Sequence, residues 1–199
     1  GAFTVKINDR TLLRSLLCAL GFPEDRLDRA CITLDKLDKI GAEGVKQELC
    51  DEGFDSTAVD GFCSFFSKDN ITLEDAEKLV SGSDAPARLR YICDTVTKIS
   101  KGKVKLEFDI TLVRGQGYYT GTVFEVRSDE FSGAIAGGGR YDNLIGRFIG
   151  EDIPAVGFSI GFERIFSILK DRGGFTVPGG RKKLVIMYDP ENFAEAEEK

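Results

Sequence analysis

The sequence predicts an α+β fold in which a helical segment precedes an antiparallel sheet. In the first hundred residues apolar side chains recur at the three- and four-residue spacing of amphipathic helices. After Gly102 they alternate with polar side chains, as in half-buried strands. The glycines follow the same division, because 7 of the 23 lie in residues 1–100 and 16 lie between Gly102 and Gly180.

Residues 11–100 are expected to form a series of short helices. The first buries a leucine-rich face and ends at Gly21, with Pro23 two residues on. A later helix runs over residues 33–49 and breaks between Gly41 and Gly44. The start signals of the remaining helices are Asp28, Ser56, Thr72 with Asp75, and Pro86.

The second half is expected to alternate between strands and helices. Residues 133–139 read as a strand that gives way to a glycine turn, and Asp142 as the cap of a short helix. Residues 173–183 have the composition of a linker, and the apolar run after them predicts the opening strand of a further, truncated domain. The other elements predicted here are strands over 104–110, 119–126 and 155–160 and a helix over 162–171.

The composition excludes several kinds of chemistry. The chain has no histidine, which rules out an imidazole general base, a Ser-His-Asp triad and a histidine-ligated zinc site. Its net charge of −6 argues against a duplex-binding surface in this segment. The five cysteines form no C-x-x-C pair, so buried reduced thiols in a cytoplasmic protein are expected. No apolar run is long enough to span a membrane, so no membrane partner is expected.

Three glycine-rich segments, residues 113–122, 137–142 and 157–164, each carry an arginine, a tyrosine or both beside a strand. Glycine in a strand often allows close approach of another group, and arginine matches carboxylate and phosphate geometry. Each segment alone is explained by hairpin turns and surface ion pairs. Three of them within about fifty residues favour a sheet floor under an anionic ligand, with its charged ends near Arg114, Arg140 and Arg164.

The order of these segments resembles a known family. LVRGQGYYTGTVFE (112–125), AGGGRYDNLIG (136–146) and PAVGFSIGFERI (154–165) are similar to the two histidine-specific motifs and motif 3 of histidyl-tRNA synthetases, which are class II aminoacyl-tRNA synthetases. FTVKINDRTLL (3–13) and ITLDKLDKIG (32–41) also resemble that family. The resemblance implies the sheet of a class II catalytic core, in its C-terminal part, with a helical insertion domain.

The resemblance also implies an activity. Family enzymes activate L-histidine with ATP, accompanied by Mg²⁺, and pass the histidyl group to tRNA(His). The arginine matched by Arg114 lies beside the α-phosphate and the substrate carboxylate, so it would act catalytically by stabilising charge. By the same matching, Arg114, Tyr118, Tyr119 and Tyr141 bind histidine, and Arg114, Gly157, Gly161 and Arg164 bind ATP, with no metal ligand supplied by the protein.

The implied domain organisation has five parts. Residues 1–41 continue the catalytic core after motif 2, residues 42–100 form the insertion domain, and residues 101–173 carry the core sheet with its motifs. Residues 174–182 are a linker, and residues 183–199 start an anticodon-binding domain. The whole family protein is a cytoplasmic homodimer.

Two departures from the family pattern bear on function. Gln116 and Gly117 stand where the first motif most often has Leu-Asp. Motifs 1 and 2 and the carboxylates that read the imidazole have no match, so we expect an excised piece that is inactive alone. The alternative is the histidine-sensing regulatory subunit of ATP phosphoribosyltransferase, a non-catalytic relative.

Overall fold

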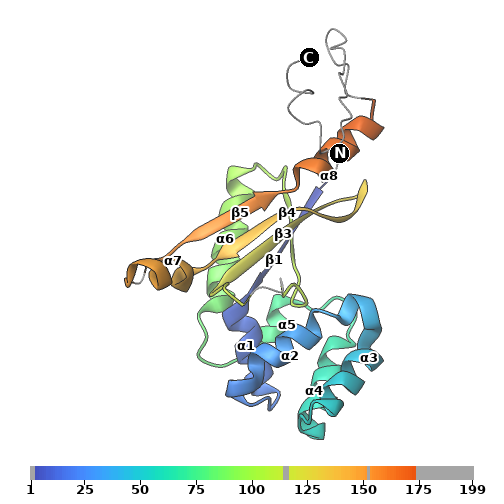
Figure 1. Ribbon diagram of the computed structural model, residues 1–199, viewed down its shortest axis with the longest axis vertical. Coiled ribbons are helices and arrows are strands. Elements are labelled where there is room, and N and C mark those ends of the chain that lie inside the picture. The colour runs from blue at the N-terminus through green and yellow to red at the C-terminus, as the bar shows by residue number, and fades with distance from the viewer. Residues whose placement is uncertain (1–2, 114–116, 152, 174–199) are drawn as a thin grey trace, which may run out of the picture.

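The computed structural model describes residues 3–113, 117–151 and 153–173. A five-stranded sheet lies at the centre, helices α1 to α5 gather at one end of it, and α6 runs along one of its faces (Figure 1). The described helices are α1 Arg10–Ala19, the 3-10 helix Glu24–Arg26, α2 Leu27–Leu34, α3 Leu37–Asp51, α4 Ser56–Phe66, α5 Leu73–Leu79, α6 Ala85–Ile99, α7 Asp142–Ile149 and α8 Phe162–Asp171.

The sheet is mixed, so the prediction of an antiparallel sheet is correct only in part. Its strand order is β2-β1-β3-β4-β5, and β1 pairs with β2 in parallel while the other three pairs are antiparallel. The parallel pair is possible because the whole helical segment from α1 to α6 forms the crossover between these two strands. The strands are β1 Phe3–Asp9, β2 Lys105–Phe108, β3 Thr122–Ser128, β4 Phe131–Arg140 and β5 Val156–Ile160.

Strand register divides the sheet into two faces of different character. Val123, Gly139 and Gly157 lie opposite one another on neighbouring strands, and so share a face, which we call the glycine face. The other face carries apolar side chains such as Ile7 and Phe124, which are also partners in register. Helix α6 packs on this apolar face, beside β1 and β2. The glycine face carries Lys6, Asn8, Val123, Glu125, Gly137, Gly139, Gly157 and Ser159.

One hydrophobic core joins β1 to the helices. It includes Ile7, the buried leucines of α1, and Phe62 and Leu89 from α4 and α6. The core therefore contains side chains from both sides of the expected domain boundary between residues 41 and 42. The assignment of residues 42–100 as an insertion domain stays a prediction.

Most helix signals are confirmed, with changes at the ends. Gly41 interrupts α3 with φ 70°, a conformation that favours glycine, as the expected break requires. Thr72 and Asp75 form a reciprocal capping box at the start of α5. Asp28 is wrong as a cap, because it lies in the first turn of α2 and the N-cap position belongs to Arg26.

The strand predictions need three corrections. The glycines of residues 137–139 form no turn, because β4 continues through them to Arg140 in register with β3 and β5. Asp142 is the first helical residue of α7, and Tyr141 holds the N-cap position. Strand β3 begins at Thr122, three residues later than expected from the apolar pattern. The linker and the strand expected after residue 173 lie outside the described residues.

Candidate functional site

Three tyrosines predicted to bind histidine are brought together at one end of the glycine face. The ring centroids of Tyr118 and Tyr119 are 4.4 Å apart, and those of Tyr118 and Tyr141 are 6.1 Å apart with the rings nearly perpendicular. The Tyr118 hydroxyl donates to that of Tyr119 at 3.3 Å. The cluster packs against Leu112 and Val123 and thus forms an aromatic wall with polar tips.

The glycines beside this cluster leave room for the rings. A Cβ atom on Gly139 would lie 2.8 Å from Cδ1 of Tyr119, and one on Gly157 would lie 3.0 Å from Cε1 of Tyr141 and overlap its hydroxyl. A Cβ on Gly139 would also lie 2.7 Å from the carbonyl oxygen of Thr122, so a larger residue there would disturb the strand backbone as well as the Tyr119 ring. A larger residue at position 157 would displace the end of the Tyr141 side chain. The close approach expected of strand glycines is therefore found, although it is made by tyrosine side chains of the same chain.

Arg164 lies at the other end of the glycine face. Its Cδ would be 3.1 Å from a Cβ on Gly161, its Nη1 donates to the carbonyl of Ala134, and its guanidinium lies 5.9 Å from the ring centroid of Phe131. Gly157 and Gly161 are four residues apart, so roughly 13 Å of strand separates the two ends. The side chain of Arg164 is exposed, and its remaining donors can meet an anion.

Arg140 does not share this face, contrary to the expectation that it lies near a charged end of the ligand. It pairs in register with Val156, one position on from the pair of Gly139 and Gly157, so it points to the apolar face. Its Nε donates to both carboxylate oxygens of Asp142, at 2.9 and 2.8 Å. Arg140 therefore fixes the start of α7.

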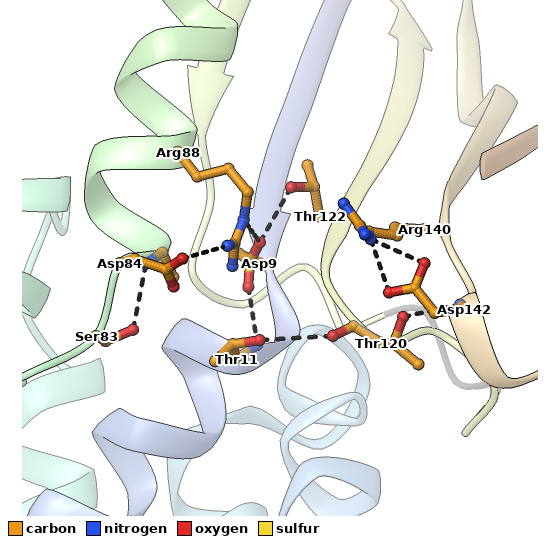
Figure 2. A network of polar contacts seen from close by, with 10 residues as sticks. Asp9, Thr11, Ser83, Asp84, Arg88, Thr120, Thr122, Arg140 and Asp142 are labelled. Carbon is orange, nitrogen blue, oxygen red and sulfur yellow. Dashed lines mark hydrogen bonds and ion pairs between the residues drawn. The ribbon is translucent and has the colours of Figure 1, made fainter. Parts of the chain in front are cut away.

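The start of α7 is tied to the loop that carries Tyr118 and Tyr119 (Figure 2). The backbone N–H of Thr120 donates to the Arg140 carbonyl at 2.8 Å, and the N–H of Asp142 donates to the Thr120 hydroxyl at 3.0 Å. Burial raises the pKa of Asp142, but the Arg140 guanidinium and the N–H of Ala155 outweigh it and hold the pKa below its ordinary value. The residues next to Tyr119 and Tyr141 are thereby locked to one another.

A buried carboxylate connects the same region to the helices (Figure 2). Asp9, with no exposed surface, accepts from the Thr11 N–H at 2.9 Å, from the Thr122 hydroxyl at 3.0 Å and from Arg88 Nε at 3.1 Å. Arg88 also contacts Asp84 at the start of α6, and its pKa is raised above the ordinary value, chiefly by Asp9. Asp9 therefore joins β1, α1, β3 and α6 at one point.

Asn8 holds the segment that leads into the first motif. Its side chain is fully buried, and Nδ2 donates to the carbonyls of Ile110 and Leu112 at 3.0 and 3.1 Å. Among the described residues its Oδ1 has no hydrogen-bond partner. Sequence reasoning missed Asn8 and Asp9, although the alternation of Phe3, Val5 and Ile7 with polar residues could have revealed β1 and its polar end.

The remaining observations concern the predicted catalytic residue, metal ligands, membrane spans and the cysteines. Arg114, the predicted catalytic residue, lies outside the described residues. Within the described ranges, no group of three or more Cys, Asp or Glu side chains could hold a metal ion. None of the helices described is long and apolar enough to cross a membrane. All five cysteines are free, but Cys18 and Cys50 are exposed, so the expectation of burial is wrong for these two.

Comparison with known proteins identifies the family. The family model described as histidyl-tRNA synthetase matches residues 1–165. The histidine–tRNA ligase of Leifsonia xyli subsp. xyli (strain CTCB07) is 40% identical over 198 residues, which cover 94% of this chain and 44% of the relative. The crystal structure of histidyl-tRNA synthetase from Nostoc sp. PCC 7120 matches with a TM-score of 0.74 at 31% identity, covering 88% of this chain and 44% of that one.

A further solved structure shares the fold. It is that of an ATP phosphoribosyltransferase regulatory subunit/histidyl-tRNA synthetase from Bacillus halodurans C, with a TM-score of 0.68 at 24% identity, covering 100% of this chain and 50% of that one. The mixed sheet with its helices thus has the architecture of part of a class II synthetase. The chain belongs to the histidyl-tRNA synthetase family, and it spans 44% of the length of the Leifsonia relative.

Proposed function

We propose that this chain supplies the part of a histidine–tRNA ligase that holds L-histidine and ATP against the catalytic sheet. The observation that carries the proposal is the cluster of Tyr118, Tyr119 and Tyr141 on the glycine face, with Arg164 roughly 13 Å along the strand. An aromatic wall with hydroxyl tips suits an imidazole and an amino group. A guanidinium at the far end suits the terminal phosphates of ATP.

The proposed reaction has two steps. In the first, a carboxylate oxygen of L-histidine attacks the α-phosphorus of ATP, a P–O bond forms, and pyrophosphate leaves with the electrons of the broken bond. In the second, a terminal ribose hydroxyl of tRNA(His) attacks the carbonyl carbon of histidyl-adenylate, loses its proton, and AMP leaves. Neither step needs an imidazole base from the protein, which agrees with a chain without histidine.

The site residues take separate roles in this proposal. Gly157 and Gly161 form the floor under the nucleotide, and Arg164 contacts its terminal phosphates. Arg114 stabilises the charge that builds at the α-phosphate, where a fixed cation lowers the barrier without proton transfer. Mg²⁺ enters as the counter-ion of ATP, and no step is assigned to it.

The alternative function is histidine sensing by a regulatory subunit of ATP phosphoribosyltransferase. The likeness to the Bacillus halodurans structure concerns the fold alone, at 24% identity. The 40% identity to a ligase supports catalysis instead. For the whole protein we propose a cytoplasmic homodimer that binds tRNA(His), and the five free thiols agree with a reducing compartment.

The test is histidine-dependent exchange of pyrophosphate into ATP by the full-length protein that contains this chain. We expect exchange, and we expect it to fall by orders of magnitude in Arg114→Ala while histidine binding weakens much less. The 199-residue chain alone should show none. Histidine binding without exchange in the full-length protein would favour the sensor, and unchanged exchange in Arg114→Ala would refute the role of this arginine.

A further inference from the structure

A polar pocket opens directly beside the tyrosine cluster. It has a volume of about 890 Å³ and lies between one side of α1, the start of α2 and the segment around Tyr119. Thr120, whose hydroxyl accepts from the backbone N–H of Asp142, is also part of its wall. The volume lies within the range of ligand-binding sites, which span roughly 300–1,000 Å³.

Two arginines of this pocket converge on one carboxylate oxygen. Arg10 Nη2 lies 3.4 Å and Arg14 Nη1 2.5 Å from Oδ1 of Asp28. The Asp28 side chain is 72% exposed, whereas that of Arg10 is only 8% exposed. Each guanidinium carries five N–H donors, far more than one solvated carboxylate oxygen accepts. Asp28 therefore orders the two arginines while leaving N–H donors of both guanidinium groups available to a ligand. The exposed Asp28 side chain can rotate away from them into solvent.

The chemistry of the pocket suits a phosphodiester. Guanidinium groups match the oxygens of phosphate in a planar, two-point arrangement. Hydroxyl and amide side chains on the walls offer further hydrogen bonds to a ribose or a base; these are Thr11, Ser15, Ser81, Thr120 and Asn143. Because the Asp28 carboxylate already contacts both arginines, only a ligand that is itself negatively charged can replace it.

We propose that Arg10 and Arg14 bind a backbone phosphate of the RNA 3′ end, in exchange for Asp28, as the terminal ribose approaches the tyrosine cluster. The inference rests on the proposed function, since it assumes an RNA that must reach Tyr119 and Tyr141. The exchange costs little for Arg14, because its pair with Asp28 is exposed and ion pairs of that kind contribute little to stability. Asp28 then acts as an internal competitor that keeps the arginines ordered while RNA is absent.

The experiment measures the binding of a 5′-fluorescein single-stranded hexaribonucleotide to the 199-residue chain by anisotropy, across a salt series. Arg14→Gln should weaken binding about tenfold and flatten the salt dependence by at most about 0.7 in slope, the value for one phosphate on a single strand. Asp28→Asn should act in the opposite direction and tighten binding, because the competing carboxylate is gone. A mere loss of local structure would not produce this opposite sign.

The matched control is Arg90→Gln. Arg90 is 41% exposed, comparable with Arg14 at 36%, and pairs with Glu74 and Glu77 outside the pocket. This variant should bind RNA as the parent chain does, and circular dichroism should show all variants folded. Equal losses in Arg14→Gln and Arg90→Gln, or weaker binding by Asp28→Asn, would overturn the proposal.

The outcome is separable from that of the proposed function. Pyrophosphate exchange by the full-length protein uses no RNA, so its absence would refute histidine activation while leaving an RNA site at Arg14 standing. If exchange is present and Arg14→Gln binds the hexaribonucleotide like the parent chain, the proposed RNA site in this pocket is refuted and the proposed function is not. The same hexamer with uncharged methylphosphonate linkages should bind the parent chain no better than it binds Arg14→Gln.

Discussion

The hydroxyl-bearing end of Tyr141 lies directly over Gly157, so that a Cβ atom at position 157 would overlap the hydroxyl. This contact places a side chain of the second motif on the backbone of the third. It exists only because β4 and β5 pair with Gly139 opposite Gly157.

Gly157→Ala is therefore expected to move Tyr141 while leaving the fold nearly intact, because the overlapping atoms belong to the end of a side chain. A displacement of about 1 Å in a substrate-positioning group lowers activity by up to about a hundredfold. We expect a tenfold to hundredfold loss in histidine-dependent exchange by the full-length protein. Unchanged exchange kinetics would show that Tyr141 does not position the substrate.

Gly138→Ala is the matched comparison and should behave in the opposite way. A Cβ there would lie 2.7 Å from Cα of Phe158 and overlap the backbone of β5, which cannot turn aside. Overpacking of this kind costs about 1–3 kcal/mol. Thermal unfolding of the chain should show a clearly lower midpoint for Gly138→Ala than for Gly157→Ala, and equal midpoints would contradict the distinction.

Removing Arg88 should destabilise the fold more than removing the charge of Asp9, although both changes break the same ion pair. Arg88→Met leaves a fully buried carboxylate without its charged partner, which typically costs about 3–5 kcal/mol. Asp9→Asn retains a good N-cap residue for α1 and leaves Arg88, which is 29% exposed, with Asp84. Urea unfolding should rank Arg88→Met as the less stable variant. The reverse order would show that the negative charge of Asp9 at the N-terminus of α1 matters more for stability than the cost of leaving its buried carboxylate unpaired.

The Lys6–Asp109 pair predicts a defined pH dependence. Burial raises the pKa of Asp109, but hydrogen bonds from Lys6, at 2.6 Å, and from Thr111 outweigh it and lower the pKa below the ordinary 3.8. The pair therefore stabilises the fold fully at a pH above the ordinary pKa of an aspartate. This contribution is lost as the pH falls through the lowered pKa of Asp109. We expect Asp109→Asn to be less stable than the parent chain at neutral pH, with the difference vanishing in acid.

The control for this prediction is a double-mutant cycle of Lys6→Met and Asp109→Asn, followed by thermal unfolding over the same pH series. The coupling between the two positions should disappear in the same acidic window. A coupling that is independent of pH would mean that packing of the lysine stem, and not charge, links the residues.

Cysteine reactivity should follow exposure and pKa. Burial raises the pKa of the Cys31 thiol to about 11, despite the opposing charges of Arg10 and Arg14. Because the thiolate is the reactive form, iodoacetamide at mildly alkaline pH should label the exposed Cys18 and Cys50 first. Cys31 should react only when urea unfolds the chain. Peptide mass spectrometry would reveal early labelling of Cys31, which would contradict its burial.

Local sequence signals located most of the elements. The leucine spacing of α1, the capping box at Thr72 and the helix 162–171 depend on interactions within a few residues, so short-range patterns contain them. The predicted turn at residues 137–139 is wrong because glycine permits both turn and strand, and these residues lie within β4. Pairing with strands on both sides decides between these conformations, and that information lies in residues distant along the chain.

Some residues of the candidate site could be found from the sequence and others only from the structure. The motifs singled out Tyr118, Tyr119, Tyr141 and Arg164, and the structure brings the three tyrosines together. Their roles in binding histidine and ATP, together with the catalytic role of Arg114, stay predictions. Asn8 and Asp9 lie in the segment 3–13, which resembles the family but received no site role, and their importance comes from partners about eighty or more residues away, such as Arg88 and Ile110.

By itself the sequence determined the family and the alternation of helix and strand, and it predicts a glycine-rich surface suited to an anionic ligand without histidine chemistry. Only the tertiary structure decided that β1 runs parallel to β2, that Arg140 points away from the glycine face, and that a pocket with Arg10 and Arg14 adjoins the tyrosines. Side-chain direction on a strand depends on register, and a shift of one residue reverses it. Register is fixed by pairing between distant segments, which a local pattern does not contain.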